Sequence, residues 1–298
     1  MVRTTLGIYR GHSGSVNAVA WSPDGTRTAS GGNDQTVQVW NAITGRNIFT
    51  YRGHSAQVNT LTWSPDGRHI ASGSNDQTVQ MWETFTNRKV FSSRVHSGWW
   101  VWVRTVAWSP DGKRIVSGSM DGIVQIWDAA SGNKVFTYDN HSSAVVTVAW
   151  SPDSTFVASG SDDKTVHVWQ AKTGSSIFTY SGHSSTVFTL EWSPNGNRIA
   201  SGSYDKTVQV WEATTRAKVF TYHGHSGCIN TAMWSPDGNQ IASGSSDGTV
   251  QIWDATTGQL IFTYRGHSGA VNTVAWSPDG TRIASGGDDQ TVQVWVAS

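Results

Sequence analysis

The chain has 298 residues, 14% of them charged, and its formal net charge at pH 7 is zero. This balance argues against nucleic acid or an anionic membrane as a partner, because both attract a basic surface. The single cysteine, Cys228, excludes an internal disulfide and a cysteine-rich metal site. No apolar stretch is long enough to span a bilayer, and the first residues lack the apolar segment of a secretion signal. We therefore expect a soluble, cytoplasmic protein.

A repeat of 42 residues runs along the whole chain. It is marked by a tryptophan before Ser-Pro, and every step is 42 residues except one of 45. The marker occurs in seven copies, at Trp21, Trp63, Trp108, Trp150, Trp192, Trp234 and Trp276. Residues 11–40 and 266–295 differ at only four positions, which indicates recent duplication or design. Copies this similar must share one local fold.

Each copy has the pattern of four short antiparallel strands. In the first copy, SVNAVAW (residues 15–21) alternates apolar and polar side chains and is followed by the turn sequence Ser-Pro-Asp-Gly. The second alternating stretch, TVQVW (36–40), lies between the turn sequences DQT and TG. No segment shows the 3.6-residue apolar period of an amphipathic helix. The sequence therefore predicts an all-β protein.

Seven such units predict a closed ring. A four-stranded unit cannot bury both faces alone, but units packed around an axis cover one another. The last copy stops before its fourth strand, whereas residues 6–10 (LGIYR) align with residues 261–265 (IFTYR). We expect the N-terminal segment to supply the missing strand, with Gly7 where the other copies have phenylalanine. The prediction is one domain, residues 1–298.

Two dipeptides connect the repeats with a known family. A Gly-His pair opens five copies, as at Gly11-His12, and a Trp-Asp pair closes two, at Trp127-Asp128 and Trp253-Asp254. The histidine occurs in all seven copies. Over all 298 residues the chain resembles the WD-repeat β-propellers. The resemblance implies a seven-bladed β-propeller with four antiparallel strands per blade, which usually binds partners on the face that carries the inter-blade loops.

Every copy also contains a histidine, a serine, an aspartate and a closing tryptophan at fixed spacing. The first set is His12, Ser30, Asp34 and Trp40, and the third is His96, Ser117, Asp121 and Trp127. Serine, histidine and aspartate are the groups of a hydrolase triad. Seven equivalent sets around a ring instead indicate a structural role, and the resemblance implies a hydrogen-bonded chain from indole through serine and histidine to aspartate. We expect no catalytic residue, no metal site and no cofactor.

Positions that differ between copies are where a specific function would reside. By the resemblance, three positions per copy lie near the loop face. Copies 1, 2, 6 and 7 are small and polar there, whereas copies 3 to 5 are bulky, and the three-residue insertion of copy 3 adds tryptophans. The predicted partner-binding residues are Trp99, Trp100, Trp102, Arg104, Met120, Val146, Phe188 and Tyr204. Tryptophan, tyrosine and arginine are common interface anchors.

The sequence therefore predicts a monomeric, non-enzymatic scaffold for a protein or peptide, with its site on copies 3 to 5. Three alternatives stay open. In the first, the inserted tryptophans pack on one another or plug the mouth of the channel. In the second, the chain is an engineered or recently amplified propeller with no specialised ligand. The third is a hydrolase with its site at the central channel, for which the varying positions supply only Asp162 and Asp288.

Overall fold

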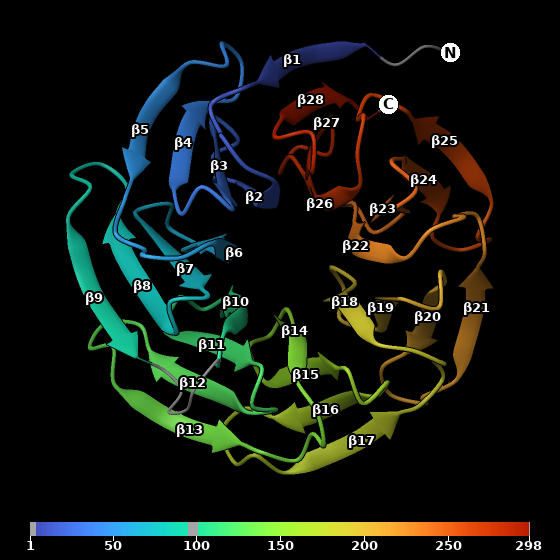
Figure 1. The fold of residues 1–298 in the computed structure, drawn as a ribbon. Helices are drawn as coiled ribbons and strands as arrows, with labels where there is room; N and C mark the ends of the chain where they lie inside the picture. Colours follow the sequence, from blue (N-terminus) through green and yellow to red (C-terminus); the bar gives the residue numbers. More distant parts are fainter. Residues whose placement is uncertain (1–3, 95–100, 298) are drawn as a thin grey trace.

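The computed structural model describes residues 4–94 and 101–297. All helices and strands assigned within these residues are strands, with no helix among them. The strands form seven four-stranded antiparallel sheets, or blades, around a central axis (Figure 1). The predicted all-β, seven-bladed fold is confirmed. Within these described ranges, no helix could cross a membrane.

The seven blades are numbered in chain order of their innermost strands. Blade 1 contains β2 (Val16–Trp21), β3 (Arg27–Gly32), β4 (Val37–Asn41) and β5 (Asn47–Tyr51). Blade 2 contains β6 (Val58–Trp63), β7 (His69–Ser74), β8 (Thr78–Glu83) and β9 (Lys89–Arg94). Blade 3 contains β10 (Val103–Trp108), β11 (Arg114–Ser119), β12 (Val124–Asp128) and β13 (Lys134–Tyr138). Blade 4 contains β14 (Val145–Trp150), β15 (Phe156–Ser161), β16 (Val166–Gln170) and β17 (Ser176–Tyr180).

The remaining blades follow the same plan. Blade 5 contains β18 (Val187–Trp192), β19 (Arg198–Ser203), β20 (Val208–Glu212) and β21 (Lys218–Tyr222). Blade 6 contains β22 (Ile229–Trp234), β23 (Gln240–Ser245), β24 (Val250–Asp254) and β25 (Leu260–Tyr264). Blade 7 contains β26 (Val271–Trp276), β27 (Arg282–Gly287) and β28 (Val292–Val296), completed by β1 (Thr5–Tyr9).

The ring is closed by pairing between the two ends of the chain. Strand β1 pairs antiparallel with β28, and Gly7 stands opposite Val294. In blade 6 the equivalent of Gly7 is Phe262, which stands opposite Ile252. The predicted closure is therefore confirmed, in the register that the alignment of residues 6–10 with 261–265 implied.

Replacing Gly7 with phenylalanine is expected to raise the melting temperature. In blade 1 the equivalent Phe49 lies edge-on to Trp82 of the next blade, with ring centres 5.3 Å apart. A Cβ atom added at Gly7 meets no atom within 4 Å, and by analogy with Phe49 we expect the phenylalanine ring to pack against Trp40. Thermal unfolding followed by circular dichroism tests this. Gly7→Ala is the control for the loss of backbone freedom, and a Phe variant no more stable than the Ala variant would contradict the prediction.

Neighbouring blades are joined by a tyrosine on the outer strand. Tyr51 stacks on Trp82 of the next blade with ring centres 4.8 Å apart, and its hydroxyl donates a hydrogen bond of 2.7 Å to Gln80. Six junctions have this tyrosine–tryptophan stack; the other five pairs are Tyr9–Trp40, Tyr138–Trp169, Tyr180–Trp211, Tyr222–Trp253 and Tyr264–Trp295. The stacking and burial of these two aromatic side chains therefore help to hold neighbouring blades together at six junctions.

The junction between blades 2 and 3 lacks this contact. On β9, Ser93 stands opposite Val79 of β8. This is the position that Tyr51 of β5 takes opposite Val37 of β4. Among the described residues, Gln125 Oε1 and the Trp108 indole of blade 3 have no hydrogen-bond partner. The three-residue insertion of copy 3 comes shortly after Ser93, partly in residues 95–100, which lie outside the described residues. This is the one junction of the seven where the sequence does not provide the outer-strand tyrosine.

Candidate functional site

Each innermost strand carries a β-bulge near its start. In β2 the pairing with β3 shifts between Val16 and Ala18, so Asn17 is the extra residue. The other six innermost strands shift at the equivalent place. A bulge re-aims the side chain of its extra residue. Here the seven extra residues all line one cavity: Asn17, Asn59, Arg104, Val146, Phe188, Asn230 and Asn272.

This cavity has a volume of about 350 Å³ and lies on the axis, at the end of the ring where the inter-blade loops run. Ser15, Asn33, Gln57 and Asp288 complete its lining. Two larger cavities, of about 480 and 500 Å³, lie at the other end of the blades. The first is lined mainly by residues 84–87 with Asp24, Arg27 and Ile48, and the second largely by residues of two Ser-Pro-Asp-Gly turns. Of these three, only the axial cavity lies where the bulged residues of all seven blades meet.

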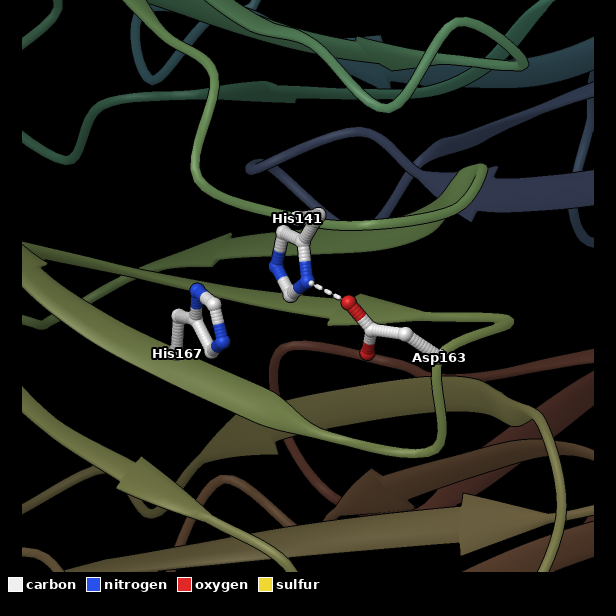
Figure 2. A group of neighbouring side chains, drawn as sticks. All are labelled: His141, Asp163 and His167. Atoms are coloured by element: carbon white, nitrogen blue, oxygen red, sulfur yellow. Dashed lines mark hydrogen bonds and ion pairs between the residues drawn. The ribbon is translucent and has the colours of Figure 1, made fainter.

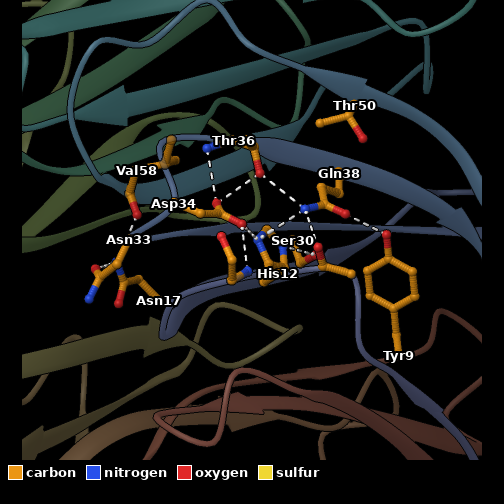
Figure 3. Close-up of polar contacts among 12 residues, drawn as sticks. Tyr9, His12, Asn17, Ser30, Asn33, Asp34, Thr36, Gln38, Thr50 and Val58 are labelled. Atoms are coloured by element: carbon orange, nitrogen blue, oxygen red, sulfur yellow. Dashed lines mark hydrogen bonds and ion pairs between the residues drawn. The ribbon is translucent and has the colours of Figure 1, made fainter.

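In the part of the cavity wall that belongs to blades 6, 7, 1 and 2, here called the asparagine wall, the bulged residue is always an asparagine. The Asn17 amide donates to Val58 O of the next blade at 2.9 Å and to Asn33 Oδ1 at 2.9 Å, as Figure 3 shows. Equivalent bonds reach the next innermost strand from Asn59, Asn230 and Asn272. These asparagines tie adjacent blades together and hold their own side chains in place.

Blades 3 to 5 break this pattern with Arg104, Val146 and Phe188. Burial lowers the pKa of the Arg104 guanidinium, whereas Asp162 and Tyr204 raise it. Within residues 4–94 and 101–297, Arg104 makes no side-chain hydrogen bond or ion pair. Phe188 contacts the Tyr204 ring at 4.8 Å between centres. This side of the cavity therefore combines an unpaired cation with an apolar and aromatic wall.

The predicted partner-binding residues occupy different parts of this region. Arg104, Val146 and Phe188 line the cavity. We expected Val146 on the open surface, but it is only 8% exposed and forms part of the cavity wall. Tyr204 and Met120 are 50% and 39% exposed, and Trp102 is half-buried. Trp99 and Trp100 lie outside the described residues. Their role as partner-binding residues stays a prediction.

The histidine sets form the same hydrogen-bonded arrangement in the six copies that are fully described. His12 Nδ1 donates to Asp34 at 2.8 Å, and Ser30 donates to His12 Nε2 at 2.8 Å (Figure 3). In the other five copies these distances are 2.7–2.9 Å. The serines are fully buried, so their hydroxyls cannot reach a substrate. The sets connect the second strand with the inter-blade loop.

The expected bond from the closing tryptophan to the serine forms in only some copies. Trp127 donates to Ser117 at 3.0 Å, and blades 4 to 7 have the same bond at 3.3–3.4 Å. The expectation is wrong for Trp40, whose indole, like that of Trp82, has no hydrogen-bond partner among the described residues. The bond is long wherever blades 4 to 7 make it, so a small further separation is enough to lose it.

The third set is described only in part, because His96 lies outside the described residues. Asp121 accepts hydrogen bonds from the Ser119 hydroxyl and, at 3.1 Å, from the Ile123 backbone. Ser117, which accepts from Trp127, is fully buried like its counterparts. The serine and aspartate of blade 3 therefore occupy the same places in the sheet as those of the other blades.

Blade 4 contains a cluster that the sequence did not indicate as a site. His167 replaces the glutamine of the other six copies and stacks on His141, with ring centres 3.9 Å apart and planes 13° apart (Figure 2). Asp163 completes a group whose ligand atoms lie within 4.8 Å of one another. Burial, followed by the charge of His141, lowers the pKa of His167 to about 4.

This cluster does not fit a metal ion. The lone pairs of an imidazole lie in its ring plane, so two stacked rings cannot both point at one ion between them. His141 also uses both nitrogens, donating to Asp163 and accepting from Ser159, each at 2.8 Å. The cluster is therefore a variant of the structural set. The only sequence sign of it is the single histidine in a column of glutamines.

Comparison with known proteins agrees with the fold. Residues 17–182 match the family model described as WDR19 first beta-propeller. Residues 174–212, 216–254 and 258–296 each match the WD domain, G-beta repeat.

Single repeats also resemble parts of longer curated proteins. The ribosome biogenesis protein erb1 of Neurospora crassa is 49% identical over 43 residues, 14% of this chain and 6% of that protein. The ERB1 proteins of Ajellomyces capsulatus and Chaetomium thermophilum are also 49% identical, over 47 and 43 residues, which are 16% and 14% of this chain and 6% and 5% of theirs. Each match is about one repeat long, and the chain spans only a small fraction of these relatives.

Proposed function

Because this chain belongs to the WD-repeat β-propeller family, we propose that it is a non-enzymatic scaffold that binds a protein or peptide at the axial cavity and the adjoining surface of blades 3 to 5. One observation carries the proposal. The bulged residues converge on a single cavity, and they change from asparagine to Arg104, Val146 and Phe188 only in these three blades. A scaffold shared by seven copies thus differs where a ligand would touch it.

The exposed residues beside the cavity support a protein partner. Tyr204 is half exposed and rests on Phe188, and Met120 is 39% exposed. Arginine and tyrosine are enriched among residues that dominate binding energy, and methionine adapts to apolar partners. A concave site with an arginine at its wall and a tyrosine at its rim would hold a protruding segment of a partner.

The rival hydrolase has less support. Among the described carboxylates only Asp288 lines the axial cavity, and it accepts a hydrogen bond of 2.8 Å from Asn272. Asp162 does not line it. Acid–base hydrolysis uses paired groups beside one substrate position, which this lining does not provide.

The names of the relatives add little about the partner. They describe ribosome biogenesis proteins, but the similarity covers one repeat, which is the part that all seven copies share. A net charge of zero also gives no basic surface for RNA. We therefore restrict the proposal to a protein or peptide.

A randomised heptapeptide display library panned on the immobilised chain tests the proposal. We expect selected peptides to lose at least about tenfold in affinity, about 1.4 kcal/mol, on Arg104→Met and on Tyr204→Ala. The matched control is Ile43→Ser with Phe85→Ser, because these two side chains are each 76% exposed at the opposite end of the blades. Thermal unfolding verifies that all variants are folded. Selected peptides that bind the Arg104 and Tyr204 variants as well as wild type, or an absence of selected peptides, would refute the proposal.

A further inference from the structure

The asparagine wall of the axial cavity has no free hydrogen-bond donors at three of its four asparagines. An amide NH₂ group has two hydrogens. Asn59 uses both, on Val103 O and Asn75 Oδ1, each at 2.7 Å. Asn17 uses both on Val58 and Asn33, and Asn272 uses both on Val16 at 3.2 Å and Asp288 at 2.8 Å. The group that each of these three asparagines has left for a ligand is its side-chain carbonyl oxygen.

These oxygens are largely unoccupied. The Asn59 oxygen receives one long contact, 3.5 Å from the Gln57 amide. No donor within the described ranges reaches the side-chain oxygen of Asn17, Asn230 or Asn272. The carboxylate of Asp288 lies on the same wall and adds a negative charge. These oxygens and the Asp288 carboxylate therefore give the wall acceptors for a basic group, although the Asn33 and Gln57 amides and the Ser15 hydroxyl on the same wall also carry donor hydrogens.

The opposite wall has the reverse character. Arg104 belongs to blade 3, and the carboxylate of Asp288 belongs to blade 7, roughly across the ring from it (Figure 1). The guanidinium offers five N–H donors and no acceptor. Within residues 4–94 and 101–297 its side chain makes no hydrogen bond or ion pair, although the charges of Asp162 and Tyr204 favour its ionised form. Burial disfavours its charge, so an anionic group placed against it would gain a strong, charge-assisted bond. Val146 and Phe188 also line the cavity, and their side chains offer no competing hydrogen-bond group.

We infer that the axial cavity selects a protein segment that presents a basic and an acidic side chain together, the basic group on the asparagine and Asp288 oxygens and the carboxylate on Arg104. This inference rests on the proposed function and specifies its ligand. A segment with only acidic groups would face the Asp288 wall with like charge, and one with only basic groups would face Arg104. Each would leave one wall without a matching group, so it would bind less tightly than a segment that satisfies both walls.

The panned heptapeptides provide the test. We expect peptides selected on wild type to be enriched in sequences that contain both a Lys or Arg and an Asp or Glu. In calorimetric titrations, replacing the acidic residue of a selected peptide with its amide should weaken binding to wild type at least tenfold. The same replacement should have little effect on binding to Arg104→Met. Replacing the basic residue with methionine should weaken binding to wild type but much less to Asp288→Asn, which keeps an acceptor for Asn272.

The outcomes separate this inference from the proposed function. Peptides that depend on Arg104 and Tyr204 but lack a basic residue, or whose basic residue shows no coupling to Asp288, would overturn the inference and leave the proposed function standing. Selected peptides indifferent to Arg104 and Tyr204 would overturn both. Coupling of each peptide charge to its own wall supports both.

Discussion

Replacing Asp76 with alanine is expected to lower the free energy of unfolding by about 3 kcal/mol, because it leaves several buried donors without an acceptor. Asp76 accepts from His54 Nδ1 at 2.7 Å, from the Ser55 and Thr78 backbones at 3.1 and 2.9 Å, and from the Thr78 hydroxyl at 2.6 Å. The His54 side chain is 0% exposed, so water cannot replace the lost carboxylate there. Denaturant unfolding at pH 7 measures the loss.

The effect of Asp76 should also depend on pH. Burial opposes ionisation of Asp76, but the hydrogen bond and charge of His54, with the bonds from Thr78 and Ser55, outweigh it and hold the pKa at about 2. A lowered pKa stabilises the fold above the ordinary value, and this contribution disappears as the pH falls toward 2. The gap between wild type and Asp76→Ala should therefore narrow between pH 4 and pH 2. Asp139→Ala, at an exposed aspartate, is the control, and an Asp76 variant as stable as this control would contradict a structural role.

Replacing Glu191 with glutamine should have the opposite effect and stabilise the protein at alkaline pH. Glu191 lies on β18, where the other copies have alanine, threonine or methionine. Its carboxyl group accepts a hydrogen bond of 2.5 Å from the Trp234 backbone of the next blade. Burial raises its pKa from 4.5 to about 8. A glutamine oxygen can accept the same bond without a charge.

The direction of this change in stability with pH follows from proton binding. Between pH 4.5 and 8 the folded chain keeps a proton on Glu191 that the unfolded chain releases, so wild type loses stability as the pH rises through this range. We expect Glu191→Gln to be about 2–4 kcal/mol more stable than wild type at pH 8, given 1.36 kcal/mol per pKa unit, and little different near pH 4. Denaturant midpoints at pH 4 to 8 measure this. Glu191→Ala is the matched variant, since alanine stands there in four other copies, and it should show the same flattened pH profile. Parallel profiles for wild type and both variants would contradict the prediction.

The fold could be predicted from the sequence because its evidence is repeated. One alternating stretch such as residues 15–21 is ambiguous, but seven copies at one spacing leave a closed ring as the simplest way to bury every face. The closure by β1 could be predicted because Tyr9 and its neighbours still match residues 261–265. The repeat position occupied by Asn17, Arg104 and Phe188 could be predicted as one where the copies differ. Its convergence on one cavity needed the bulges, which leave no mark in the alternation of the strands.

Other features depend on distances that a sequence does not contain. The indole of Trp40 and that of Trp211 occupy equivalent positions, yet only Trp211 reaches its serine, at 3.3 Å. The stack of His167 on His141 depends on which side chains the sheet register places together. The interaction of Glu191 with Trp234 crosses between blades, so it has no pattern within a single repeat.

A closed ring of like blades can open only at a junction between two blades, so the junctions set its resistance to opening. The junction of blades 2 and 3 has Ser93 in place of the tyrosine that the other six share, and Arg104 lies on blade 3 beside it. A ligand that contacts Arg104 together with asparagines of blades 1 and 2 would span this junction. Binding of such a ligand would then stabilise the ring against opening, first of all between blades 2 and 3.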